Sequence, residues 1–204
     1  MSNDTVLAER LTEDGRRWLE AATEHVRSDA TAIRTLFPAV GRKVGRGDTE
    51  DAARALLLVS LPAQGQALAD EVAALYRYGD AAEKRGVLRA LHLLDLGDDA
   101  LPVVRDALRT NDTRLVAAAL GGYGAKHLDQ AAYRQGVLKC VFVGVPLAEI
   151  DGLDDRADDE LARMLADFAR ERIAAGRTIP DDVWLVLDRF PATAAGLRKT
   201  AEEA

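Results

Sequence analysis

The chain has 204 residues, of which 48% are hydrophobic, 5% aromatic and 30% charged, and its formal net charge is −7 at pH 7. A chain of this length buries about 70% of the surface that it exposes when unfolded, so it can fold as one compact domain without a disulfide or a metal. The negative charge argues against a nucleic-acid-binding protein, because such proteins gather Lys and Arg on one surface.

The single cysteine, Cys140, excludes an internal disulfide and suits a reducing compartment. The first five residues are polar and carry no apolar signal core, and no stretch approaches the roughly 18 apolar residues of a membrane-spanning helix. We therefore expect a cytoplasmic protein without a membrane span.

Apolar residues recur at helical spacing in the N-terminal half of the chain. Together with caps and breakers they predict helices at about 6–27, 30–44, 48–61 and 62–78. Asp48 or Thr49 is expected to cap the third of these helices. Pro38 is expected to interrupt the second, because proline lacks the backbone donor and clashes with the preceding turn.

From Asp80 the helical pattern repeats. Residues 85–91 and 114–120 lie about 29 positions apart and share a rhythm of charged, apolar and small residues. The pattern Ala100-Leu101-Pro102, followed by Asp112, Arg114, Ala117, Ala118, Leu120 and Gly121, resembles a HEAT repeat. We predict an all-α single domain over residues 1–204, a HEAT-like α-solenoid with helix pairs at about 48–122 and a motif-rich C-terminal part at about 123–191. An irregular helical bundle is the alternative.

Aspartates stand at the expected starts of several helices in the C-terminal half. Asp112, Asp129 and Asp158 each precede a helical pattern and are expected to act as N-caps. Residues 154–158 also have the DDxxD spacing with which isoprenoid synthases hold magnesium and diphosphate. We favour the capping role for Asp158, because a second metal motif is missing, and we predict no metal site and no cofactor.

Several segments of the C-terminal half are similar to the EboA family. They are residues 111–115 (Asn-Asp-Thr-Arg-Leu), 126–128, 137–147, 152–157 (Gly-Leu-Asp-Asp-Arg-Ala), 160–172 and 175–177. The resemblance implies a bacterial gene cluster with a prenyltransferase, a sugar-phosphate-cyclase-like protein and barrel-fold enzymes, which makes or moves a specialised metabolite. It implies no catalytic residues. At 133–136, where the family has an aromatic residue, Asn and Gln, this chain has Tyr-Arg-Gln-Gly.

Lys139 is the candidate catalytic residue, because a lysine beside an apolar strip could reach a phosphate, a buried carboxylate or a substrate carbonyl. The alternatives are a stem that lies along apolar surface with its ammonium in solvent, or an ion pair with Asp112 or Asp167. Cys140 and His127 could form a nucleophile and its base, although a lone cysteine among apolar residues is more often part of the core.

We interpret the chain as a non-catalytic binding or scaffold component of a pathway that makes or transports a bacterial specialised metabolite. The alternative is an enzyme that acts on a phosphorylated cyclitol or isoprenoid intermediate. Expected partners are proteins of the same pathway or a small phosphorylated or prenylated metabolite. Arginines at turns could either brace loops or bind an anion. The candidate binding residues are Asn111, Asp112, Arg114, His127, Lys139, Asp154, Arg156, Asp167 and Arg172.

Overall fold

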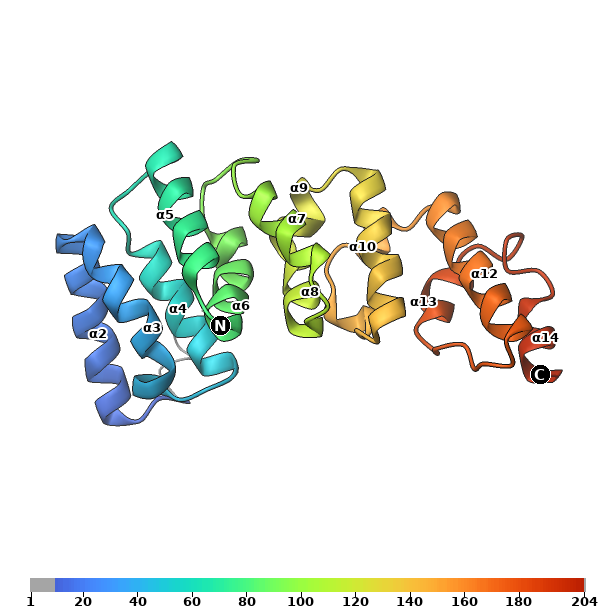
Figure 1. The fold of residues 1–204 in the computed structure, drawn as a ribbon, viewed down its shortest axis with the longest axis horizontal. Helices are drawn as coiled ribbons and strands as arrows, with labels where there is room; N and C mark the ends of the chain where they lie inside the picture. Colours follow the sequence, from blue (N-terminus) through green and yellow to red (C-terminus); the bar gives the residue numbers. More distant parts are fainter. Residues whose placement is uncertain (1–9, 204) are drawn as a thin grey trace. The chain divides into compact units, whose positions relative to one another are not determined.

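The computed structural model describes residues 10–203, which form α-helices, short 3-10 turns and loops and contain no strand. The predicted all-α class is therefore confirmed. Contacts divide the chain into two compact units, an N-terminal unit of Met1–Arg109 and a C-terminal unit of Thr110–Ala204 (Figure 1). No helix within the described part of the chain is long and apolar enough to cross a membrane. The single domain and the HEAT-like arrangement stay predictions.

In the N-terminal unit α4 is the central helix, because it packs on α6, α3 and α2, while α5 packs on α6 (Figure 1). The helices of this unit are α2 (Glu13–Ser28), α3 (Ile33–Val44), α4 (Asp48–Val59), α5 (Gly65–Tyr78), α6 (Ala81–Ala90) and α7 (Leu101–Arg109), with 3-10 turns η1 (Ala30–Ala32) and η2 (Leu91–Leu93).

In the C-terminal unit α10 packs on α8 and α12, and α12 also packs on α13 and α14. The helices of this unit are α8 (Thr113–Ala119), α9 (Gly122–His127), α10 (Gln130–Val143), α11 (Leu153–Arg156), α12 (Asp159–Ala174), α13 (Val183–Leu187) and α14 (Leu197–Glu203), with a 3-10 turn η3 (Leu147–Glu149).

Aspartate caps begin several of these helices as the sequence predicts. Asp112, Asp129 and Asp158 each accept a hydrogen bond from a backbone amide in the first turn of α8, α10 and α12. Asp80 does the same for α6, where it accepts from the amides of Ala82 and Glu83. Such a cap contributes about 1 kcal/mol, because it satisfies a donor that the helix itself leaves unpaired.

The prediction that Pro38 interrupts a helix is wrong, because α3 continues through it. Losing one backbone hydrogen bond and accommodating the ring costs about 3 kcal/mol. Ile33, Phe37 and Val40 lie on the buried face of the same helix and are fully inaccessible to solvent. Burial of such side chains contributes about 1.5–3 kcal/mol each, which outweighs the cost of the proline.

Other features also differ from prediction. The N-terminal helix begins at Glu13 after a Thr12 cap, and the predicted start near Val6 lies outside the described residues. The third helix begins after Gly47, and neither Asp48 nor Thr49 caps it. Glu50 replaces them: its carboxylate accepts from the Gly47 amide at 3.2 Å. For residues 149–157 the sequence predicts a loop, whereas the structure has the short helix α11 there.

Charged side chains lie in the interior between α4 and α6. Glu50, Asp51 and Arg54 of α4 are only 5%, 4% and 2% exposed. Arg85 of α6 donates to Asp51 at 2.7 and 3.1 Å and to Glu50 at 2.9 Å. Arg89 of α6 adds an ion pair with Asp51 at 3.2 Å. We call Glu50, Asp51, Arg54 and Arg85 the buried charge cluster, and the exposed Arg89 lies at its edge.

Arg54 connects this cluster to the surrounding helices. Its Nη1 donates to the carbonyl oxygen of Ala82 at 3.1 Å and lies 3.3 Å from Glu50 Oε2. Its guanidinium also lies over the Phe37 ring of α3, 5.5 Å from the ring centre. A Cβ on Gly86 would come within 2.6 Å of Arg54 Cδ, so α6 can approach α4 this closely only because position 86 has no side chain.

Replacing Arg54 with Met is expected to destabilise the N-terminal unit by about 3–5 kcal/mol, because it leaves two buried carboxylates short of a cation. Urea unfolding followed by Trp18 fluorescence in a Trp184→Phe background reports this unit alone, since Trp18 is then the only tryptophan. The matched control is Arg77→Met on exposed α5 surface, which should change stability by less than about 0.5 kcal/mol. Equal effects of the two substitutions would contradict a stabilising role for the cluster.

Candidate functional site

Arg156, a predicted binding residue, makes four hydrogen bonds within the C-terminal unit. Nη1 donates to the Ala125 carbonyl at 2.7 Å, Nη2 donates to the Leu128 carbonyl at 2.8 Å, and Nε and Nη2 donate to Gln130 Oε1 at 3.2 and 3.0 Å. The guanidinium also stacks over the Tyr133 ring, 4.2 Å from its centre. Arg156 therefore joins the end of α9 to the start of α10.

The first turn of α12 is tied to α10 by a second arginine. Arg134 forms a bidentate pair with Asp158, with its Nη2 at 2.6 Å from Oδ2. Gln130 donates to the same carboxylate at 2.8 Å and to the Arg156 carbonyl oxygen at 2.8 Å. The paired Arg134 holds the pKa of Asp158 well below its usual range. The capping role is confirmed, and this carboxylate is already engaged.

Tyr133 and Gly152 fix the turn that precedes Arg156. Tyr133 is fully buried, and its hydroxyl donates to the Asp151 carbonyl at 2.6 Å. Burial raises the pKa of this phenol to about 12. Gly152 has φ +78°, and a Cβ there would lie 2.9 Å from the Cβ of Ala125. The conformation of this turn and its close approach to Ala125 therefore require a glycine at position 152 of the Gly-Leu-Asp-Asp-Arg-Ala motif.

The other candidate residues lie at several separate places. Asp112 pairs with Arg114 at 2.7 Å, and Asp167 pairs with Arg163 and Arg170 along the exposed face of α12. Asp154 is exposed, and its Oδ1 lies 3.3 Å from Arg189 Nη1, on the rim of a pocket of about 440 Å³.

Three further candidate residues lie elsewhere in the C-terminal unit. The exposed Asn111 precedes α8, and His127 stacks on Tyr123 with ring centres 4.3 Å apart. Arg172 donates to the Thr178 carbonyl and lies over Phe168.

Lys139 is half-buried on α10 and forms no hydrogen bond or ion pair with any residue that the structure describes. The expected alternatives Asp112 and Asp167 are instead paired with arginines. Cys140, the next residue, is fully buried, and burial raises the pKa of its thiol to about 12. A thiol with that pKa is protonated at neutral pH, which disfavours a Cys140 nucleophile.

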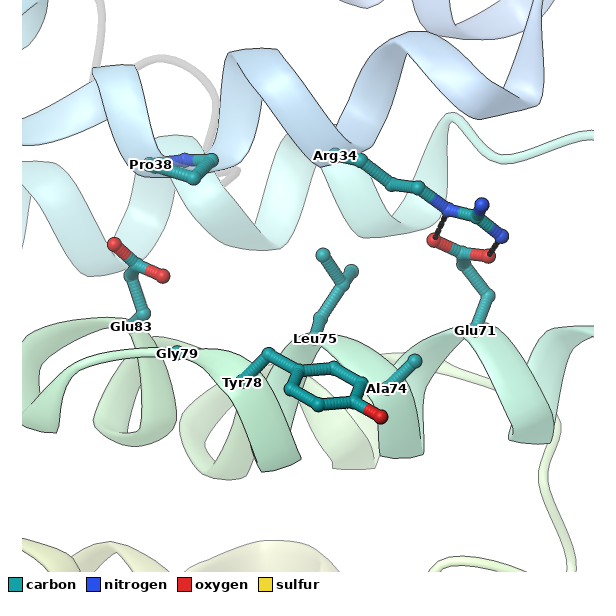
Figure 2. A pocket seen from close by; sticks show the side chains of 8 residues that line it. All are labelled: Arg34, Pro38, Glu71, Ala74, Leu75, Tyr78, Gly79 and Glu83. Carbon is teal, nitrogen blue, oxygen red and sulfur yellow. Dashed lines mark hydrogen bonds and ion pairs between the residues drawn. The ribbon is translucent and has the colours of Figure 1, made fainter.

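A pocket of about 480 Å³ opens in the N-terminal unit, between α3 and α5 and at the start of α6 (Figure 2). Its lining consists of Arg34, Pro38, Glu71, Ala74, Leu75, Tyr78, Gly79 and Glu83. This volume lies within the range of small-molecule sites, which are mostly apolar with a few polar groups at fixed positions. We call it the α3–α5 pocket.

Charged groups stand at the two ends of the α3–α5 pocket, with apolar groups between them. At one end Arg34 donates to both carboxylate oxygens of Glu71, at 3.0 and 2.7 Å. Glu83 and Pro38 stand at the other end, and Leu75 projects into the space between (Figure 2). Tyr78, which is 83% exposed, forms part of the rim.

Sequence reasoning missed the α3–α5 pocket, because its residues belong to ordinary helical patterns. The predicted break at Pro38 also hid the continuous helix α3, which forms one side of the pocket. The visible signals in the sequence were a tyrosine directly before Gly79, and Asp80 followed three positions later by Glu83, which is the spacing of a capping box. Neither signal identifies a pocket until α3 is placed opposite α5.

Arg156→Lys is expected to destabilise the C-terminal unit by about 2 kcal/mol or more, because lysine cannot reproduce the guanidinium fork or its stacking. Trp184 fluorescence in a Trp18→Phe background reports this unit during urea unfolding. The control is Arg163→Lys, whose exposed pairs on α12 should contribute about 0.5 kcal/mol or less. If Arg156→Lys is as stable as its control, the hydrogen bonds and stacking of Arg156 do not stabilise this turn.

Asp158→Asn is expected to cost the same unit about 1 kcal/mol at neutral pH, since the cap remains but the charge opposite Arg134 is lost. The pKa of Asp158 is lowered on folding, so its contribution is present above the unfolded pKa of about 3.9 and is lost as pH falls through the folded pKa. Wild type and variant should therefore converge in acid. A stability difference that does not depend on pH would contradict this pairing.

A family model described as "Metabolite traffic protein EboA" matches residues 46–188. The match covers more than half of the chain, including the buried charge cluster, α5 and the Arg156 turn. No curated protein and no solved structure matches the chain. The resemblance expected from the motifs of the C-terminal half is confirmed, and the chain belongs to the EboA family of metabolite traffic proteins.

Proposed function

We propose that this protein binds a small metabolite without transforming it, as a component of a bacterial pathway that makes or moves a specialised metabolite. The α3–α5 pocket carries the proposal. It has the volume of a small-molecule site, apolar lining from Leu75, Ala74 and, at the Glu83 end, Pro38, and polar groups at both ends. A family of metabolite traffic proteins fits such a binding role.

The character of the lining favours an apolar ligand, such as a prenylated metabolite, over a phosphorylated one. Arg34 is the one cationic group among the lining residues, and Glu71 already engages it with both carboxylate oxygens. A phosphate bound to Arg34 would have to displace Glu71 from it. Phosphate sites instead offer free arginine, lysine or backbone donors.

The candidate residues of the C-terminal unit fit a structural role more closely than a catalytic one. Arg156 and Asp158 are engaged with neighbouring main-chain and side-chain groups. Cys140 is buried as a thiol. The alternative, an enzyme that uses Lys139 on a phosphorylated cyclitol or isoprenoid intermediate, stays a prediction, and so does a scaffold role toward other proteins of the pathway.

Isothermal titration calorimetry with geraniol, a small prenyl alcohol, tests the proposal. Ala74→Trp should weaken geraniol binding by at least about tenfold, because the indole would occupy the pocket. Ala73→Trp is the control, since residue 73 is exposed on the same helix and is not a lining residue. Equal binding by both variants, or no binding by wild type, would contradict the α3–α5 pocket as the site.

A turnover assay separates binding from catalysis. Geraniol, geranyl diphosphate and inositol 1-phosphate incubated with wild type should be recovered unchanged when analysed by mass spectrometry. Conversion of any of them by wild type but not by Lys139→Ala would contradict the non-catalytic role and support the enzyme.

A further inference from the structure

We propose that the α3–α5 pocket selects apolar molecules that carry a protonated amine, with Glu83 as the group that receives it. This inference rests on the proposed function and names the ligand class of the same site. It starts from the placement of Glu83, whose carboxylate stands at the end of the pocket opposite the Arg34–Glu71 pair (Figure 2).

Glu83 is half-buried and forms no ion pair with any described residue. Its position depends on Gly79, because a Cβ there would lie 2.8 Å from Glu83 Cβ and 3.1 Å from Oε2. Burial is the main cause that raises the pKa of this carboxyl, and the charge of the nearby Asp80 carboxylate acts in the same direction, whereas a hydrogen bond with the Asp80 backbone lowers this pKa. A partly buried carboxylate without a paired cation is stabilised in its charged form when a positively charged donor binds it.

The cations near Glu83 have other roles or lie in solvent. Arg54 lowers the pKa of Glu83, but its guanidinium is bound to Glu50 and to the Ala82 carbonyl in the buried charge cluster. Arg42 of α3 has a smaller effect in the same direction and is exposed. Arg34 is neutralised by Glu71. Among the lining residues one carboxylate therefore remains without a matching cation.

The apolar side chains between the two polar ends of the pocket determine the shape of the apolar part of the ligand. Glu71 lies seven positions before Tyr78, the last residue of α5, so the helix rises about 10 Å from the Arg34–Glu71 pair to the end beside which Glu83 lies. Leu75 and Ala74 lie between these polar ends, and Pro38 of α3 lies across from Glu83 (Figure 2). A hydrocarbon chain with one amine end would cover these side chains and place its ammonium at Glu83.

Four ligands with one carbon skeleton test this inference by calorimetry: geranylamine, geraniol, geranic acid and geranyl phosphate. At neutral pH geranylamine should bind about tenfold or more tightly than geraniol, because a charge-assisted hydrogen bond replaces a neutral donor. The two anions should bind more weakly than geraniol. Glu83→Gln should remove the preference for the amine and leave geraniol binding within about twofold, since the pocket shape is kept.

Asp70→Asn is the matched control. It removes one carboxylate from the exposed side of α5 and should keep the preference for the amine, which excludes an effect of net charge alone. Circular dichroism checks that both variants fold. Equal affinities for geranylamine and geraniol in wild type, or an amine preference that survives Glu83→Gln, would overturn the inference while leaving pocket binding intact. If no geranyl compound binds, the proposed function itself fails.

Discussion

The structure of the N-terminal unit depends on a charged interaction in its interior. Arg85 forms ion pairs with both Glu50 and Asp51, and Arg54 links the same carboxylates to the carbonyl of Ala82 at the start of α6. Buried ions tolerate little displacement, because losing a partner exposes an uncompensated charge to a low-dielectric interior. The cluster therefore fixes α6 against α4, and contact between Arg54 and Phe37 extends this constraint to α3. These are the helices that supply Pro38 and Glu83 to the α3–α5 pocket.

The C-terminal unit uses its arginines differently. Arg156 satisfies two carbonyl groups where α9 ends and α10 begins, and Arg134 holds the N-cap of α12. Helix ends leave carbonyl and amide groups without partners, so these side chains complete the hydrogen bonding of a unit built from short helices. The motif residues Gly152 and Arg156 can be explained by this bracing alone, whereas the α3–α5 pocket has apolar surface open to a ligand.

The all-α class and most helix starts could be predicted, because they follow from local chemistry. An aspartate before an apolar-periodic segment caps a helix wherever the fold places it, as Asp80 and Asp129 do. The buried charge cluster could not be predicted, because Arg85 meets Asp51 across 34 positions and each looks like a surface residue. The break expected at Pro38 failed for a related reason, since burial of its neighbours outweighs a local penalty. The candidate site followed local motifs and so missed a pocket made by helices distant in sequence.

Methyl NMR of protein labelled at alanine and leucine methyl groups and titrated with geraniol locates the ligand on the protein directly. We expect the largest shift changes at Ala74 and Leu75, which line the α3–α5 pocket, and only small changes at leucines of the C-terminal unit such as Leu138 beside Lys139. Shift changes concentrated at Leu138, with Ala74 and Leu75 unaffected, would contradict a ligand site in the α3–α5 pocket and would place it near Lys139.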